Sequence, residues 1–414
     1  MSARRLCAGG WWLAAIALCA ALPGCGGVGT SPAAETVGSQ LTIYSGLPLQ
    51  GPDGAISKQI VGGEKLALAG AGGRVGRFTV SYVSLNDSNA TTGEWDPDVT
   101  SANAKAVAQD PTTIAYIGDF NSGATAISLP LINGAGILQV SPASPYIGLT
   151  SSLDAGQDEP ERFYPTGKRT FGRIAPSDSV QAAAQVSALR ALGVGRVYVL
   201  ADQDPFDSPL ATIFASDAQA AGVEVVGPDT VTIAPGSNLT GEVAKIVDSG
   251  AQAVFVSATA TTQAAQLFRE LHSAAPKMSL LASSAMLNPV FTASLGSAEA
   301  VSTVGSPMLP EHMYPASAQQ VFDQYRRRFG ESAEPYALYG YESMSAVLAA
   351  IRAAGKHGDD RQSVIERLRS LHDRRSVLGT YSMSPGGEAT LSAYAIDRIA
   401  HGEAVFWRAS SATG

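Results

Sequence analysis

Residues 113–141, TIAYIGDFNSGATAISLPLINGAGILQVS, decide the fold class of this chain. The stretch begins with the apolar run 113–118, which is typical of a buried strand, and ends with a second such run at 136–141. Between the two runs, Ser122 stands where a helix N-cap is favoured. Strand, helix and strand in this order predict a parallel βαβ unit whose sheet is covered by helices.

The same alternation of strands and helices extends outward from this stretch. It begins again after residue 170, which predicts two α/β units of similar size. Roughly 375 residues after the N-terminal segment are too many for one core and favour two lobes. Further expected strands lie at 41–44, 78–83, 196–200, 223–226, 253–257 and 279–282, and further expected helices at 59–71, 96–108, 180–192, 210–221, 237–249, 262–273, 316–329, 336–354 and 361–371. Runs 378–383 and 393–399 flank a turn and predict a closing hairpin.

The first 24 residues have the pattern of a secretory signal peptide. Arg4 and Arg5 precede an apolar run at 11–22, which is short for a membrane span. The run leads to Cys25 in a context similar to the lipobox of bacterial lipoproteins. We therefore expect a signal peptide at 1–24, lipidation of Cys25, and a flexible tether at 25–40 that holds an extracytoplasmic protein at the membrane. A plain secretory signal with an incidental cysteine is the alternative.

Cysteine and charge content narrow the classes further. The three cysteines are Cys7, Cys19 and Cys25, so the expected mature chain has no disulfide, cysteine metal site or cysteine nucleophile. The net charge is −8, and the longest run of basic residues is only three arginines, at 326–328. We therefore expect no nucleic-acid partner.

Enzyme signatures are missing from the sequence. The five histidines have no metal-ligand spacing, and no nucleophile elbow occurs. The run 70–73 is glycine-rich but lacks the lysine of a phosphate loop, and no dinucleotide fingerprint follows the strand at 41–44. We expect neither catalysis nor a cofactor.

Five segments in order resemble the branched-chain amino acid binding proteins, which have the type I periplasmic-binding-protein fold. The segments are 46–52 with 62–68, 117–122, 136–144, 202–206 and 339–342. The resemblance implies two Rossmann-like α/β lobes joined by a three-crossover hinge. It implies a first lobe at 40–170 plus 305–376 and a second at 171–304 plus 377–410. It also implies a monomer that binds a small polar ligand between the lobes and delivers it to ABC permease subunits. A ligand sensor for a signalling receptor would have the same fold.

The resemblance also implies a ligand site. Asn121 and Ser122 lie where the family holds a ligand carboxylate on a hydroxyl and helix amides, although Ser122 also suits a plain N-cap. Ala143 and Ser144 align with groups that contact the same ligand end, and Tyr146 could replace a family threonine that is Pro145 here. The remaining candidates are Phe206, an aromatic closing over the ligand, Thr259 at a strand end, Ser283, and Tyr341 near the hinge, for which a core position is the alternative.

One departure bears on the ligand. The family places an acid that pairs with the ligand ammonium where this chain has Ser283 and Ser284. A buried ammonium needs a carboxylate or several acceptors. Asp119 and Asp202 are candidates near the expected site, but each also suits a helix cap or a solvent-facing position. The ligand is therefore left open between an amino acid, an amide and a carboxylic acid.

Overall fold

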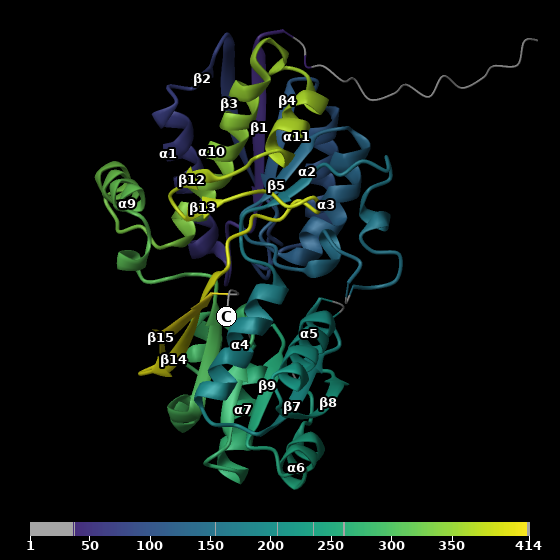
Figure 1. Cartoon of the computed structure of the whole chain (residues 1–414), viewed down its shortest axis with the longest axis vertical. Helices are drawn as coiled ribbons and strands as arrows, with labels where there is room; N and C mark the ends of the chain where they lie inside the picture. The colour runs from purple at the N-terminus through teal and green to yellow at the C-terminus, as the bar shows by residue number, and fades with distance from the viewer. Residues whose placement is uncertain are drawn as a thin grey trace, which may run out of the picture. The chain divides into compact units, whose positions relative to one another are not determined.

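The computed structural model describes residues 36, 38–153, 155–204, 206–234, 236–259 and 261–411. The predicted signal peptide, Cys25 and most of the predicted tether lie outside these residues. The described chain contains two large sheets flanked by helices, as predicted (Figure 1). Within these residues, no helix is both long and apolar enough to cross a bilayer.

The first sheet has the strand order β2-β3-β1-β4-β5-β6 and is parallel except at the β2 edge. All of β4 is buried, as expected for a parallel strand covered on both faces. The strands are β1 (Gln40–Leu47), β2 (Arg74–Val75), β3 (Phe78–Asn86), β4 (Thr113–Gly118), β5 (Leu138–Ser141) and β6 (Phe171–Arg173). The accompanying helices are α1 (Gly54–Gly70), α2 (Pro97–Gln109), α3 (Ser122–Gly134), α9 (Ala316–Phe329), α10 (Tyr336–Ala354) and α11 (Arg361–Arg369).

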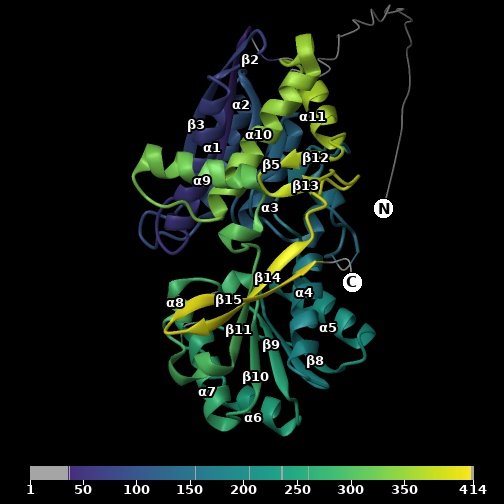
Figure 2. The same cartoon turned by 60° about the vertical axis from the view of Figure 1, so that its left-hand side comes forward.

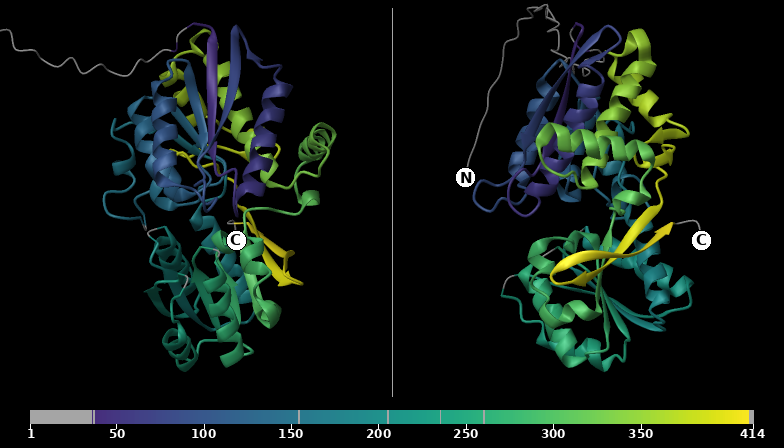
Figure 3. Two further views of the ribbon diagram at one scale, coloured as in Figure 1. Left: turned by 180° about the vertical axis from the view of Figure 1, so that it is seen from behind. Right: turned by 90° about the vertical axis from the view of Figure 1, so that its left-hand side faces the viewer.

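The second sheet has the order β15-β14-β11-β10-β9-β7-β8, and only β14 and β15 run antiparallel to their neighbours. Helices flank this sheet as well (Figure 3). The strands are β7 (Arg196–Asp202), β8 (Glu224–Val231), β9 (Ala253–Ser257), β10 (Ser279–Ala282), β11 (Ser302–Ser306), β14 (Ala393–Ala400) and β15 (Glu403–Ser411). The helices are α4 (Asp178–Ala191), α5 (Asp207–Ala220), α6 (Thr240–Asp248), α7 (Thr262–Ala274) and the short α8 (Pro289–Thr292).

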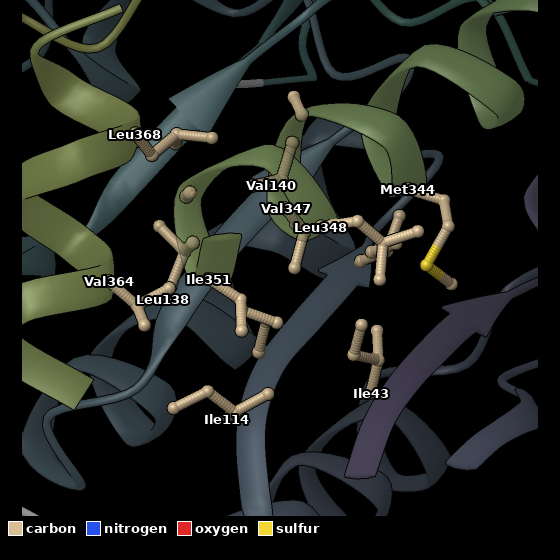
Figure 4. Close-up of a cluster of buried hydrophobic side chains, with 14 of the residues drawn as sticks. Ile43, Ile114, Leu138, Val140, Met344, Val347, Leu348, Ile351, Val364 and Leu368 are labelled. Atoms are coloured by element: carbon tan, nitrogen blue, oxygen red, sulfur yellow. The ribbon is translucent and has the colours of Figure 1, made fainter. Parts of the chain in front are cut away.

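The core of the first sheet follows from helical spacing in α10. Met344, Leu348 and Ile351 recur at intervals that place them on one helix face, and all three are buried, as their spacing predicts. They pack with α11 side chains against the strand residues Ile43 and Ile114 (Figure 4). This packing fixes the first sheet and, with it, the loops that follow its strands.

The chain passes between the two sheets three times within the described residues. The passages lie between β6 and α4, between β11 and α9, and between Ala389 and β14. β6 pairs with β5, so the first sheet extends to Arg173, beyond the predicted lobe limit at 170. Tyr381, Met383 and Ala389 likewise pack in the core of the first sheet, although the predicted second-lobe segment begins at 377.

The predicted closing hairpin is wrong. Instead of pairing with the run at 393–399, β13 (Gly379–Tyr381) pairs with β12 (Arg374–Ser376). β14 pairs with β11 and with β15, which sequence analysis missed, and the β14–β15 ribbon forms one edge of the second sheet (Figure 2). The glycine-rich turn between the two runs closes only an isolated bridge between Met383 and Ala389, and the two ribbons lie on either side of it.

Candidate functional site

A cavity of about 440 Å³ lies where the strands of both sheets end. Its walls come from loops after β1, β3, β4, β5, β6, β7, β9, β10 and β11. Open parallel sheets bind ligands beyond the carboxyl ends of their strands. The volume falls within the range of about 300–1,000 Å³ that is usual for small-molecule sites.

Five of the predicted site residues line this cavity together: Asn121, Ser122, Ala143, Phe206 and Thr259. Three come from loops of the first sheet and two from loops of the second. Residues up to 138 positions apart in sequence (121 to 259) meet at this cavity because each lies just beyond the carboxyl end of a strand.

Ser122 begins α3, but the N-cap position belongs to Asn121. The Ser122 Oγ accepts a hydrogen bond of 3.3 Å from the Tyr146 backbone N–H and caps no amide of its own helix, so the N-cap role expected for Ser122 is wrong. Because the oxygen is used as an acceptor, the hydroxyl proton remains available to a ligand. The first-turn amides of α3 lie beside it.

Gly123 is packed too tightly for a side chain. A Cβ there would lie 2.7 Å from the Trp95 ring and 3.1 Å from the Phe206 ring. Phe206 also packs edge-on against Tyr146, with ring centroids 5.0 Å apart. The aromatic ring of the second-sheet loop therefore rests on the start of α3.

Ser144 and Tyr146 support the cavity wall without lining it. The Ser144 Oγ is buried, 2.6 Å from the Thr125 Oγ1, and donates to the Asp119 carbonyl at 3.0 Å. The Tyr146 hydroxyl donates to Glu159, which turns the phenol away from the cavity. Both hydroxyls are thus engaged inside the protein.

Ser283 and Tyr341 also do not line the cavity. Ser283 is fully buried, and its Oγ donates to the Ala258 carbonyl at 3.3 Å, whereas its neighbour Ser284 does line the wall. Tyr341 lines a separate hollow beside Glu342 and Arg374, because the helical period of α10 carries it to the face that packs on β12 and β13.

The two acids that sequence analysis considered as partners for a ligand ammonium are engaged elsewhere. Asp119 is fully buried and accepts hydrogen bonds from Tyr116 and Ser128. The Asp202 Oδ1 accepts from the Gln203 and Ile233 amides. Neither residue lines the cavity.

Other acids do line the cavity, and sequence analysis missed them. Asp178 and Asp207 begin α4 and α5 and line the cavity. Only 3% of the surface of Asp178 and 7% of that of Asp207 is exposed. Gln181 Nε2 lies 3.3 Å from Asp178 Oδ1, and Gln181 Oε1 accepts from the Ser284 amide at 2.6 Å. Asp178 was missed because β6 is only three residues long, too short for its sequence to predict a strand and the ligand-facing loop that follows it.

Burial governs the protonation of these acids. It raises the pKa of Asp178 to about 7, with the Arg173 charge acting in the opposite direction. Burial also raises the pKa of Asp207 well above its usual range, and the charges of Asp204 and Asp202 add to the effect. The pKa of Asp53 is raised by burial too, against a 3.4 Å hydrogen bond from Asn121 Nδ2.

The site offers hydroxyl, amide and carboxylate groups between aromatic walls, which suits reversible binding of a small polar molecule. Among the described residues, no three His, Cys, Asp or Glu side chains are placed to share a metal ion. The geometry therefore points to recognition by hydrogen bonds and charge.

A family model described as "Periplasmic binding protein" matches residues 46–403. A search of curated proteins found no significant match.

Solved structures show the same fold. A leucine binding protein from Thermotoga maritima aligns with a TM-score of 0.73 at 19% identity, covering 90% of this chain and 99% of that one. An ABC transporter substrate-binding protein from Desulfitobacterium hafniense, in complex with Leu, gives 0.71 at 22% identity, covering 89% and 100%. A solute-binding protein of an ABC transporter from R. palustris, in complex with benzoate, gives 0.69 at 16% identity, covering 90% and 96%. These likenesses confirm the predicted two-lobed α/β fold.

Proposed function

Because the chain belongs to the periplasmic binding protein family, we propose that it captures a small polar solute in the 440 Å³ cavity and delivers it to the permease of an ABC importer. One observation carries the proposal: the cavity is walled by loops from both sheets and by five residues that the sequence singled out. In this proposal a polar, electron-rich end of the solute lies at Ser122 and the first-turn amides of α3. The protein binds its solute without converting it.

The contacting residues proposed from the sequence fall into two groups. Asn121, Ser122, Ala143, Phe206 and Thr259 would contact the solute directly, since each lines the cavity. Ser144, Tyr146 and Ser283 would act through the wall that they hold in place. Tyr341 has no part in the proposed site.

The experiment that tests this function is a ligand screen on the purified protein. A solute that binds only the native state raises the melting temperature in proportion to its concentration over Kd. We expect at least one amino acid, amide or carboxylic acid to do so, with one-to-one stoichiometry by calorimetry and no change in the solute by mass spectrometry. Turnover of the solute, or no binding across the whole screen, would contradict the proposal.

We also propose that Cys25 carries the lipid that holds the protein outside the cytoplasm. The proposal rests on the basic start, the apolar run 11–22 and the residues that precede Cys25. We expect the native protein in the membrane fraction, and Cys25→Ala in the soluble or unprocessed fraction. An unmodified Cys25 in the mass spectrum of the membrane-derived protein would contradict it.

A further inference from the structure

The charged side chains that line the cavity are all acidic. Five carboxylates line it, and none of the described residues that line it is Lys, Arg or His. The carboxylates are Asp53, Glu94, Asp178, Asp204 and Asp207. Glu94 and Asp204 are exposed at the rim, where water screens them, but Asp178 and Asp207 are buried.

Within the described residues, one hydrogen bond is found to each of the Asp178 and Asp207 carboxyls. Gln181 Nε2 lies 3.3 Å from one oxygen of Asp178, and the Ser257 hydroxyl lies 3.3 Å from one oxygen of Asp207. Both carboxyls line the same cavity, and the charge of Asp178 makes the smallest contribution to the raised pKa of Asp207. Arg173 partly offsets the charge of Asp178, but burial of a carboxylate with so few donors still costs free energy, which a further donor or positive charge would reduce.

Helix position alone does not account for these two acids. An aspartate in the first turn interacts favourably with the helix dipole, and Asp98 does this in α2. Asp98, however, is exposed, whereas Asp178 and Asp207 are within a tenth of full burial and turned into the cavity. Because both acids are buried in the protein and also line the cavity, a donor or cation on a ligand in the cavity would reach them.

The remaining walls also suit a positive group. The rings of Trp95, Phe120, Phe206, Tyr336 and Tyr394 line the cavity. Aromatic rings attract cations through their electron-rich faces, and they repel carboxylates there. No basic side chain among the described lining residues is available to neutralise an anionic ligand.

We propose that the solute carries a cationic nitrogen, an ammonium or amidinium group, and that this group binds between Asp178 and Asp207. The inference rests on the proposed solute-binding function and narrows its ligand class. In this proposal Asp178 and Asp207, at the starts of α4 and α5, take the role of the acid that the family has where this chain has Ser283. A carboxylic acid without a nitrogen cation is excluded from this class.

Matched ligand pairs on the purified protein test the proposal by calorimetry. The pairs are benzylamine and benzoate, L-leucinamide and 4-methylpentanoate, and 1,4-diaminobutane and succinate. We expect at least one amine to bind at least ten times more tightly than its carboxylate partner. Asp178→Asn and Asp207→Asn should each weaken binding of that amine tenfold or more. Asp98→Asn, which removes a first-turn acid outside the cavity, should leave it unchanged.

The outcomes separate this inference from the function on which it rests. Tighter binding of a carboxylate than of its amine partner, or amine binding that both Asn variants leave unchanged, overturns the cationic ligand and leaves the solute-binding function standing. No binding by any member of the pairs, together with a failed solute screen, overturns both. If an Asn variant does not fold, the pairs on the unmodified protein still decide the ligand charge.

Discussion

The starts of α3 and α5 face the same cavity with opposite chemistry. Each helix begins in the loop after a parallel strand, so each directs free amides and a positive dipole end toward the ligand space. α3 begins with Ser122 and has no acid in its first turn, whereas α5 begins with the buried Asp207. The backbone supplies the position, and one side chain decides the sign of the charge that a ligand meets.

The largest expected effect comes from closing the space between the two helix starts. Gly123→Leu should abolish binding of the preferred amine, because even its Cβ would lie within 3.1 Å of the Trp95 and Phe206 rings. Calorimetry measures the loss. Gly134→Ala, at the other end of α3 with open space around it, should leave affinity unchanged and keep or raise the melting temperature. Full binding by Gly123→Leu would place the site elsewhere.

Giving α3 the acid that α5 already has should change ligand preference. Ser122→Asp adds a carboxylate beside the α3 amides, so L-leucine should lose affinity by a factor of about 100 while L-leucinamide loses much less. The ratio of the two dissociation constants is the measurement. An equal loss for both ligands would show that the ligand carboxylate does not approach α3.

The acidic side should make amine binding depend on pH. Asp178, with a pKa of about 7, faces Arg173, Gln181 and Glu388, and Asp207 faces Ser257 and the charges of Asp178, Asp202 and Asp204. A cation favours the ionised carboxylates, so binding releases protons. Affinity for benzylamine, which stays protonated, should rise from pH 6 to pH 8 by up to about tenfold per unit for each proton released.

That pH dependence has an internal check. In Asp178→Asn the slope of affinity against pH should become shallower, and the heat of binding should vary less with the ionisation enthalpy of the buffer. A flat profile in the unmodified protein would mean that neither acid changes protonation on binding.

A smaller effect is expected on the α3 side. Ser122→Ala removes a hydroxyl donor from the cavity wall. The affinity for L-leucinamide should fall by a factor of about 5, which corresponds to about 1 kcal/mol for one neutral hydrogen bond. Calorimetry at constant pH measures it, and unchanged affinity would remove Ser122 from the contact set.

A buried acid away from the cavity should affect stability alone. Glu64 is fully buried, accepts a 3.3 Å hydrogen bond from Ser45, and has its pKa raised by burial to about 8. The folded state therefore holds this proton more tightly than the unfolded state, and the free energy of unfolding falls as pH rises from about 5 to 8. Glu64→Gln should flatten that fall in denaturant titrations without changing affinity for any amine.

Most of the fold and the location of the cavity could be predicted from the sequence. The spacing of apolar residues shows which faces of strands and helices are buried. This spacing predicted both sheets and the buried face of α10 with Met344 and Ile351. The rule that ligands bind at strand ends supported the site at Ser122, and the family resemblance added Ala143 and Phe206; all three line one cavity. These inferences needed only local pattern and the family resemblance.

Tertiary structure alone decided the strand partners near the C-terminus and the charge of the site. The run at 393–399 pairs with β11, almost a hundred residues away, because sheet partners depend on the whole fold and not on the nearest turn. Asp178 and Asp207 become a pair only because α4 and α5 pack with their starts at one cavity. A sequence pattern records how deeply a residue is buried, but it does not record which distant residue shares that burial.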